Sequence, residues 1–128
     1  MRFLLDSTVL IDHLNGADEA EGFLRTHAHD SCISVITINE VLAGSESSAV
    51  QGHELLLDQF ACLNVDKLTT KTSAALRRQH RWRLADSIQA ALALANGLKL
   101  VTRNHRDFKP AKHPFVIVPY RLSSERKG

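Results

Sequence analysis

Five short apolar runs alternate along this chain with segments of helical periodicity, and this alternation limits the folds available to it. The runs are rich in Leu, Ile and Val and are bounded by polar residues, which is typical of strands. Strands that alternate with helices predict parallel pairing, right-handed crossovers and helices on both faces of the sheet. The expected fold class is therefore α/β, as a three-layer α/β/α sandwich with a parallel central sheet. The predicted strands cover residues 2–5, 32–36, 62–65, 100–102 and 115–118.

The segment of residues 84–96 has the clearest helical pattern in the chain. Its apolar residues recur at spacings of three and four, five alanines favour a helix, and Gly97 provides a C-terminal stop. Near the N-terminus, Ser7 or Thr8 is suited to cap a short helix that runs to Leu14. Further helices are predicted from Asp18 onward, over residues 37–44, around residues 55–60 and over residues 67–81.

The length of 128 residues indicates one domain, because two halves of about 60 residues would each be marginally stable. With 44% hydrophobic and 23% charged residues, the composition is that of a globular protein rather than a disordered or fibrous one. We expect residues 1–122 to form this domain and residues 123–128 to be a loose charged tail. The chain has no apolar run of the ~20 residues that a membrane helix needs and no secretory cleavage site, which predicts a cytoplasmic protein.

The two cysteines show no metal-binding pattern. Cys32 and Cys62 form no C-x-x-C motif and have no His at zinc spacing. Both fall in predicted strands, so we expect them to be buried free thiols.

Acidic side chains occur where parallel strands end. Asp6 ends the first predicted strand, Glu40 follows the second, Asn104 and Asp107 follow the fourth, and Asp86 opens the helix of residues 84–96. In a parallel sheet the strand ends share one edge, where crowded carboxylates raise one another's pKa and a divalent cation relieves the repulsion. Oxygen ligands suit Mg²⁺ or Mn²⁺, which can activate water for phosphodiester hydrolysis.

Each acidic residue also fits a purely structural role. Thr37 and Glu40 match a capping box, and Asp86 in a first helical turn complements the helix dipole. Asp6 could be an N-cap and Asp107 a turn residue. These local patterns are common, so each residue alone favours the structural role, but four such residues at one edge of a sheet favour a functional site.

Arginines lie close to these acidic residues in the sequence. The net charge of +2 is too small to indicate a nucleic-acid-binding protein by itself. Guanidinium groups bind phosphates bidentately, so Arg81, Arg83, Arg103 and Arg106 are candidate substrate contacts. A solvated helix face or a partner surface is an equal alternative for Arg81 and Arg83. Trp82 lies between them, and both stacking on a base and packing in a core remain open for its ring.

Two other classes of function share this pattern. A phosphoacceptor receiver-like signalling domain needs an Asp at the end of its third strand and a Lys at the end of its fifth. Asp66 follows the third predicted strand, but Pro119 and Tyr120 follow the fifth, so the fit is poor. A catalytically silent module that binds RNA or protein could keep the same fold, although the intact acidic set argues against it.

Four motifs of the chain resemble those of PIN domains. They are LLDSTVLI at residues 4–11, TINEVLAG at residues 37–44, LADSIQAA at residues 84–91 and GLKLVTRNHRDF at residues 97–108. Their order and spacing match across nearly the whole chain, and the likeness is strongest to VapC-type toxins of toxin–antitoxin pairs. In the third motif, Gln89 replaces the small apolar residue that the family pattern favours, a change that an exposed face would tolerate.

The resemblance implies a Mg²⁺- or Mn²⁺-dependent endoribonuclease that cleaves single-stranded RNA and is the toxin of such a pair. By the same resemblance, Asp6, Glu40, Asp86 and Asp107 match the acidic catalytic and metal-binding residues of the family. Asn104 matches a further metal-ligand position, which is often acidic in PIN domains and an amide in many VapC-like members. Family members commonly dimerise and are silenced by a small antitoxin. The implied partners are therefore an RNA substrate, a cognate antitoxin and a second copy of the chain.

Overall fold

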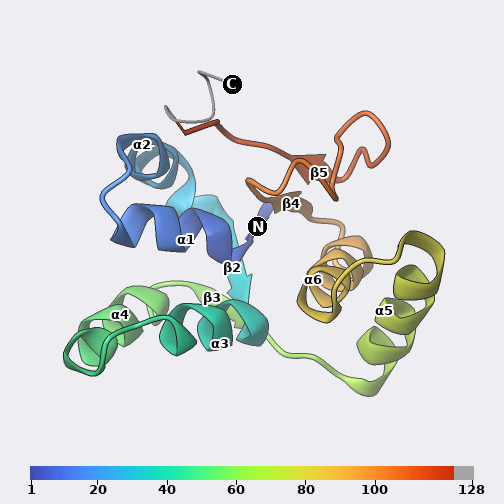
Figure 1. Ribbon diagram of the computed structural model, residues 1–128, viewed down its shortest axis with the longest axis horizontal. Helices are drawn as coiled ribbons and strands as arrows, with labels where there is room; N and C mark the ends of the chain where they lie inside the picture. The colour runs from blue at the N-terminus through green and yellow to red at the C-terminus, as the bar shows by residue number, and fades with distance from the viewer. Residues whose placement is uncertain (123–128) are drawn as a thin grey trace.

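The computed structural model describes residues 1–122 and contains a five-stranded parallel sheet between two layers of helices (Figure 1). The α/β/α sandwich predicted from the sequence is thereby confirmed. The tail expected at residues 123–128 lies outside the described residues. The strands are β1 (Phe3–Leu5), β2 (Ser31–Ser34), β3 (Ala61–Leu63), β4 (Lys99–Val101) and β5 (Val116–Ile117), in the order β3-β2-β1-β4-β5.

Within residues 1–122, six α-helices cover the two faces of the sheet. They are α1 (Ser7–Leu14), α2 (Asp18–His27), α3 (Val35–Ala43), α4 (Val50–Leu57), α5 (Lys67–His80) and α6 (Leu84–Ala95), with short 3-10 turns η1 (Ala28–Asp30) and η2 (Ser47–Ala49). The helices α1 to α4 share one hydrophobic cluster with the sheet, whereas α6 packs on the opposite face and α5 packs against α6 (Figure 1). Every helix among residues 1–122 is too short or too polar to cross a membrane.

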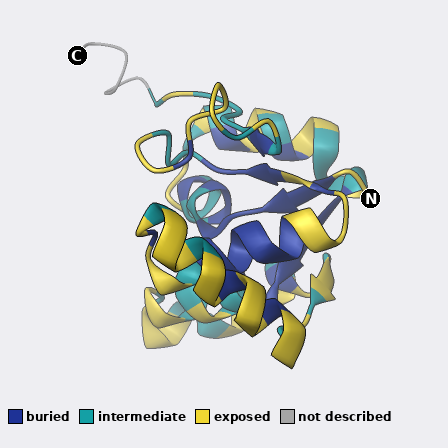
Figure 2. Ribbon diagram, turned by 90° about the vertical axis from the view of Figure 1, so that its right-hand side faces the viewer, coloured by how far each residue is buried: buried dark blue, intermediate teal, exposed yellow. Residues whose placement is uncertain are grey.

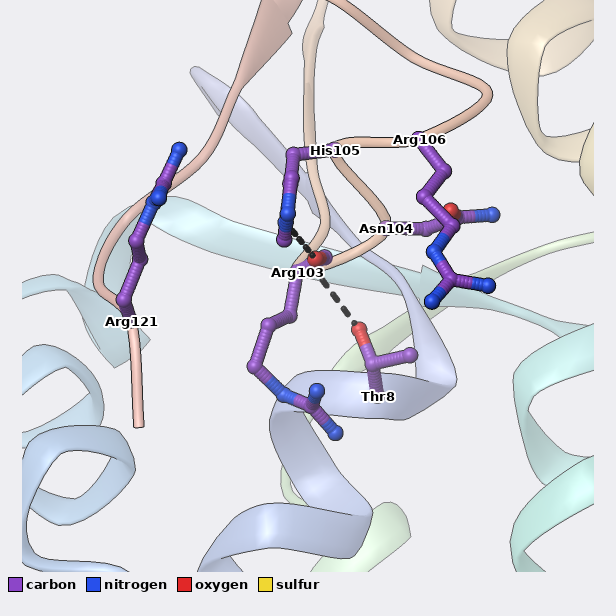
Figure 3. Close-up of a pocket in the computed structure, with 6 residues that line it drawn as sticks. All are labelled: Thr8, Arg103, Asn104, His105, Arg106 and Arg121. Atoms are coloured by element: carbon purple, nitrogen blue, oxygen red, sulfur yellow. Dashed lines mark hydrogen bonds between the residues drawn. The ribbon is translucent and has the colours of Figure 1, made fainter. Parts of the chain in front are cut away.

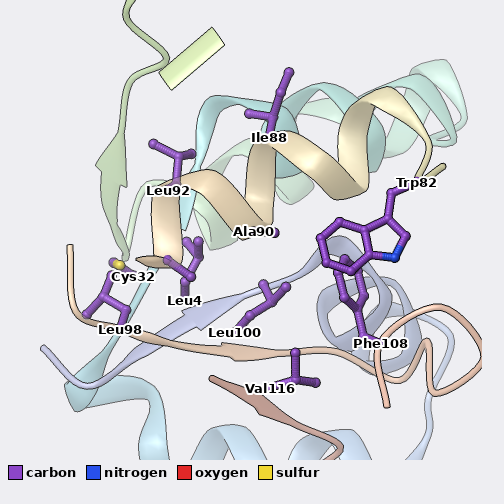
Figure 4. Packing of buried hydrophobic residues seen from close by; sticks show 11 residues of the cluster. Leu4, Cys32, Trp82, Ile88, Ala90, Leu92, Leu98, Leu100, Phe108 and Val116 are labelled. Atoms are coloured by element: carbon purple, nitrogen blue, oxygen red, sulfur yellow. The ribbon is translucent and has the colours of Figure 1, made fainter. Parts of the chain in front are cut away.

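The alternation of side chains along the strands produces these two cores. Leu4 of β1 and Leu100 of β4 point toward α6, whereas their neighbours Phe3, Leu5 and Val101 point toward α1 and α2. Figure 4 shows the first cluster, with side chains of α6 lying over the strands. Buried residues concentrate in the strands and in α6, which lies behind the exposed α5 in Figure 2. Both faces of the parallel sheet are therefore covered, as such sheets require.

Three local predictions are wrong. The second strand ends at Ser34, because the Ser34 side chain caps α3 by accepting hydrogen bonds from two backbone N–H groups of its first turn. The helix α4 begins and ends earlier than the segment around residues 55–60 that was expected. Both cysteines are free thiols as expected, but only Cys32 is buried, because Cys62 lies on the edge strand β3 and is exposed.

The topology concentrates polar groups beside β1 and β4. The chain leaves β1 through α1 and α2 on one face of the sheet, and it enters β4 from α5 and α6 on the other face. Ligands of open α/β sheets bind beyond the carboxyl ends of the strands at such a switch point. Asp6 and Thr102 directly follow the two neighbouring strands, so the site is expected between them.

Candidate metal centre

Asp6 lies at the carboxyl end of β1 and is held by two hydroxyl groups. The hydroxyl oxygens of Thr8 and Thr102 donate to Asp6 Oδ2 at 3.0 and 2.9 Å. The side chain is only 5% exposed, and it makes no capping hydrogen bond to α1. Asp6 therefore occupies the N-cap position of α1, but its side chain does not cap the helix. No hydrogen bond from residues 1–122 reaches Asp6 Oδ1, which leaves this oxygen available to a ligand.

Glu40 lies in the middle of α3 and faces the start of α1. Its Oε1 accepts a hydrogen bond from the Ser7 hydroxyl at 3.0 Å. Because Ser34 is the N-cap of α3, Thr37 and Glu40 do not form the capping box that the sequence allowed. Ser7 was expected to cap α1, but its hydroxyl instead holds a carboxylate of another helix. Glu40 is thus placed for a role at the edge of the sheet rather than at its helix end.

Asn104 joins the two remaining carboxylates. Its Nδ2 donates to Asp107 Oδ2 at 3.1 Å and makes a longer contact of 3.5 Å to Asp86 Oδ2. The backbone N–H of Asp107 donates to Asn104 Oδ1 at 3.4 Å, which closes a turn after β4. The amide therefore brings a residue of α6 and a residue of this turn together while its oxygen faces the turn.

The pKa values of Asp86 and Glu40 are both raised by burial and by the charges of neighbouring carboxylates. Burial raises the pKa of Asp86 from 3.8 to about 6, with further increases from the charges of Asp6, Asp107 and Glu40. The positive charge of Arg83 opposes this shift. Burial also raises the pKa of Glu40, partly offset by the hydrogen bond from Ser7 and increased further by the charge of Asp6. The sequence prediction that these carboxyl groups crowd one edge of the sheet agrees with these shifts.

The donor set suits a hard divalent cation. Across residues 1–122, no group of three or more His, Cys, Asp or Glu side chains lies close enough together to hold a metal ion, so these residues form no ready-made protein cage. Mg²⁺ does not require such a cage, because it usually keeps several waters and takes one or two carboxylates from the protein. The candidate ligands at this edge are carboxylate and amide oxygens with hydroxyl oxygens beside them, and such oxygen donors favour Mg²⁺ or Mn²⁺ over softer metals. A cation there would also relieve the repulsion that raises the pKa of Asp86.

The four candidate arginines lie in different environments. Arg83 precedes α6 and acts electrostatically on Asp86. Arg106 is exposed and lines a cavity together with Asn104. Arg81 ends α5 in the left-handed conformation, with φ of 59°, and lines a separate hollow with other arginines of that helix. Arg103 pairs with the buried Asp12, with its Nε 2.7 Å from Oδ2 and its Nη2 3.1 Å from Oδ1.

Trp82 packs in the core, which was one of the two alternatives for its ring. It is 7% exposed, and its ring centroid lies 4.7 Å from that of Phe108. Its Nε1 donates to the backbone carbonyl of Asp107 at 3.2 Å. Trp82 therefore stabilises the turn that carries an acidic residue of the site, and its buried ring is not an exposed stacking platform.

Gln89 is buried, so it does not lie on an exposed face that would tolerate a polar residue. The residues of α6 from Ser87 to Ala93 are all buried, because this helix lies between the sheet and α5. Gln89 is 1% exposed, and its amide binds the hydroxyls of Ser34 and Thr37 at 2.7 and 2.8 Å. A polar residue inside an otherwise apolar run of a helix was the available signal for such a network.

The hydroxyl groups that hold Asp6 and Glu40 were also missed as parts of the site. Thr102 directly follows β4, so its position at the shared edge of the sheet was open to prediction. Ser7 and Thr8 were assigned to helix capping because their place after a strand is typical of N-caps. Their partners depend on tertiary structure, which brings the carboxyl ends of β1 and β4 and the helix α3 together.

Comparison with known proteins agrees with this fold. A family model of the PIN domain matches residues 3–113, so the chain belongs to the PIN domain family. A chain of a toxin–antitoxin complex from Klebsiella pneumoniae is 33% identical, with 93% of this chain and 98% of that chain covered and a TM-score of 0.84. The resemblance to PIN domains and to VapC-type toxins is thereby confirmed. A search of curated proteins found no match.

Two more distant structures show the same fold. The FitAcB structure from Neisseria gonorrhoeae contains a chain 24% identical to this one, covering 94% of this chain and 99% of that chain with a TM-score of 0.77. A chain of the DNA-bound VapBC structure from Salmonella typhimurium is 22% identical, covering 85% and 91% respectively, with a TM-score of 0.71.

Proposed function

We propose that this protein is a metal-dependent endoribonuclease that hydrolyses phosphodiester bonds of single-stranded RNA as the toxin of a toxin–antitoxin pair. The observation that carries the proposal is that Asp6, Glu40 and Asp107, which come from three other segments, lie near the half-buried Asp86. Burial raises the pKa of Asp86 to about 6, and the charges of these three carboxylates add to the increase. Such crowding is unfavourable for the folded chain alone, and it is favourable once a cation neutralises it. Membership of the PIN domain family supports the same activity.

The four carboxylates, with Asn104 beside them, would hold Mg²⁺ or Mn²⁺. When bound, such a cation activates water and stabilises the leaving oxygen of a phosphodiester, giving a 3′-hydroxyl and a 5′-phosphate. Asp6 and Asp86 are the principal ligands in this proposal, because the hydroxyls of Thr8 and Thr102 fix Asp6 in a single orientation. Glu40 and Asp107 complete the site or orient water.

The proposed partners follow from relatives. The similar chain from Klebsiella pneumoniae belongs to a toxin–antitoxin complex, which supports a small antitoxin as the partner of this chain. We also propose a homodimer and a cytoplasmic location, as is common in this family.

The receiver-like alternative is weakened by the environment of Asp66. Its side chain caps α5 by accepting a hydrogen bond from the backbone N–H of Thr69 at 2.7 Å, and this bond lowers the pKa of Asp66. A carboxylate with a capping role explains the position of Asp66 after β3 without phosphoryl transfer. The silent binding module remains the alternative that an activity assay must address.

The decisive experiment compares wild type with Asp6→Asn on a panel of cellular RNAs, with Mg²⁺ or with a chelator, and with cleavage ends mapped. We expect Mg²⁺-dependent cleavage by wild type and a loss of at least about 100-fold in Asp6→Asn, on the scale of a lost catalytic electrostatic contact. Asp58→Asn is the matched control. Asp58 is exposed directly after α4, and its substitution removes the same charge at a position outside the site. Equal cleavage by Asp6→Asn and wild type would overturn the assignment, and no cleavage by wild type would favour the silent module.

A further inference from the structure

A cavity of about 490 Å³, here called the loop pocket, opens beside the acidic residues (Figure 3). Its side chains come from α1, from the turn after β4 and from the segment after β5. None of them is a carboxylate, whereas Asp6 and Asp86 lie one hydrogen bond away through Thr8 and Asn104. The lining residues are Thr8, Arg103, Asn104, His105, Arg106 and Arg121.

Two cations of the loop pocket are available to a ligand. Arg106 and Arg121 are exposed, and neither takes part in an ion pair within residues 1–122. Arg103 differs, because its guanidinium already pairs with Asp12. The available charge of this pocket therefore comes from Arg106 and Arg121.

A second hollow of about 200 Å³, here called the histidine pocket, lies on the other part of the same turn. It contains the exposed cations Lys109 and Lys112, and Asp107 is the one carboxylate among its lining residues. Neither lysine forms an ion pair within the described chain. The lining residues are His80, Trp82, Arg106, Asp107, Lys109, Lys112 and His113.

The two pockets share one lining residue, and both border the acidic residues. Arg106 lines both pockets, the loop pocket reaches the acidic residues at Asn104, and the histidine pocket reaches them at Asp107. A ligand that spans the two pockets would thus carry negative charge at two places and pass the carboxylates between them. That is the charge pattern of a strand whose scissile phosphate lies on a cation with further phosphates on each side.

We infer that the loop pocket and the histidine pocket bind the phosphates of single-stranded RNA that flank the cleaved bond, with Arg121 and Lys112 as substrate contacts. This inference rests on the proposed function. Guanidinium groups match phosphate oxygens bidentately, and lysines bind phosphates as point charges, so this set of side chains suits a phosphate backbone. The contacts are to phosphates, so they contribute affinity rather than base specificity.

The test measures binding of a labelled single-stranded RNA to the full-length chain at several salt concentrations, with a chelator present so that no metal contributes. The variant Arg121→Ala/Lys112→Ala removes one cation from each pocket. We expect its slope of log affinity against log salt to be shallower by about 1.4, at ~0.7 for each lost phosphate contact on a single strand. The control Lys67→Ala/Lys71→Ala makes the same change in net charge on exposed positions of α5 outside both pockets, and its slope should equal that of wild type.

Equal slopes in the pocket variant and the control would overturn the inference. Competition by polyglutamate as strong as competition by unlabelled RNA would also overturn it, because the pockets would then take an acidic peptide. Cleavage in Mg²⁺ is measured on the same proteins. RNA that binds with the expected slopes but is never cut defeats the proposed function alone, and RNA that is cut while the slopes stay equal defeats this inference alone.

Discussion

Nε2 of Gln89 donates a hydrogen bond to Oγ1 of Thr37 over 2.8 Å, and this bond joins the helix of Asp86 to the helix of Glu40. Gln89 lies one turn after Asp86 in α6, and Thr37 lies one turn before Glu40 in α3. The two acidic residues are therefore connected through side chains that are at most 1% exposed. Loss of either hydrogen-bonding partner should be costly, because water does not reach these buried polar groups to replace it.

The same network reaches β1. The Thr37 hydroxyl donates to the carbonyl of Leu5 at 3.2 Å, and Leu5 is the residue before Asp6. The Ser34 hydroxyl donates to Gln89 Oε1 at 2.7 Å while it caps α3. Three of the four segments that carry acidic residues are thus tied together beneath the site.

Replacement of Gln89 by Leu should destabilise the protein. The substitution removes the acceptor of the Ser34 hydroxyl and the donor to Thr37, so the free energy of unfolding should fall by about 1–3 kcal/mol. Urea denaturation measures this change. The control is Gln79→Leu, at an exposed position of α5, and a similar loss in both variants would contradict a role for the buried network.

The stability of the metal-free protein should fall as the pH rises through the pKa of Asp86. This pKa is raised from 3.8 to about 6, so the folded state binds the proton more tightly than the unfolded state does. The resulting stabilisation is complete below about pH 4 and is lost as the pH rises through about 6. Because Asp86 is only half-buried, solvent screening leaves an effect on the order of 1 kcal/mol.

Urea denaturation of chelator-treated protein at about pH 5 and about pH 7 measures this dependence. The variant Asp86→Asn should lose most of the difference, whereas Glu54→Gln on the exposed side of α4 should keep it. Added Mg²⁺ should stabilise the protein more at the higher pH, because a cation binds the ionised carboxylate. A pH dependence that Asp86→Asn leaves intact would show that another group is responsible.

Arg103 should matter for stability far more than Arg106 does. Its bidentate pair with Asp12 compensates a carboxylate that is 5% exposed, and the Tyr120 hydroxyl donates to the same carboxylate at 2.8 Å. Arg103→Ala should cost about 2–4 kcal/mol, slightly below the range for a fully buried pair because the arginine is partly exposed. Arg106→Ala should stay within about 0.5 kcal/mol, as expected for an exposed side chain.

Thermal or urea unfolding of the two variants measures the difference. Adding Asp12→Asn to Arg103→Ala should recover part of the loss, because the uncompensated buried charge is then removed. If Arg103→Ala lowers the free energy of unfolding as little as Arg106→Ala does, the ion pair does not stabilise the fold. Arg103 is then again a candidate RNA contact.

Binding of Mg²⁺ should change the fluorescence of Trp82. This residue is the one tryptophan of the chain, and its indole N–H donates to the backbone carbonyl of Asp107. A titration with Mg²⁺ should give a saturable signal in wild type and an affinity weaker by at least about 10-fold in Asp86→Asn, since one ionised ligand is lost. Trp82→Phe removes the signal and serves as the control, while an unchanged titration in Asp86→Asn would argue against a cation at these residues.

Much of the fold was accessible from local patterns. A strand shows a period of two and a helix a period of 3.6, and both depend on neighbouring residues in the chain. Their alternation predicted a parallel sheet, and a parallel sheet brings its strand ends to one edge. That argument predicts that Asp6 after β1 and the Asn104–Asp107 turn after β4 lie at the same edge of the sheet.

The tertiary structure alone decided which side chains pair. The bond from Gln89 to Thr37 spans 52 positions and the pair of Arg103 with Asp12 spans 91, so no periodicity within one segment contains either of them. Packing of α6 between the sheet and α5 buries Gln89, where it links two helices. The buried Asp12 pairs with Arg103, which the sequence alone indicates as a candidate substrate contact. Sequence thus determined the elements and the edge of the sheet where polar groups gather. Desolvation upon packing determined the partners, because a buried polar group must find its hydrogen bond wherever the fold provides one.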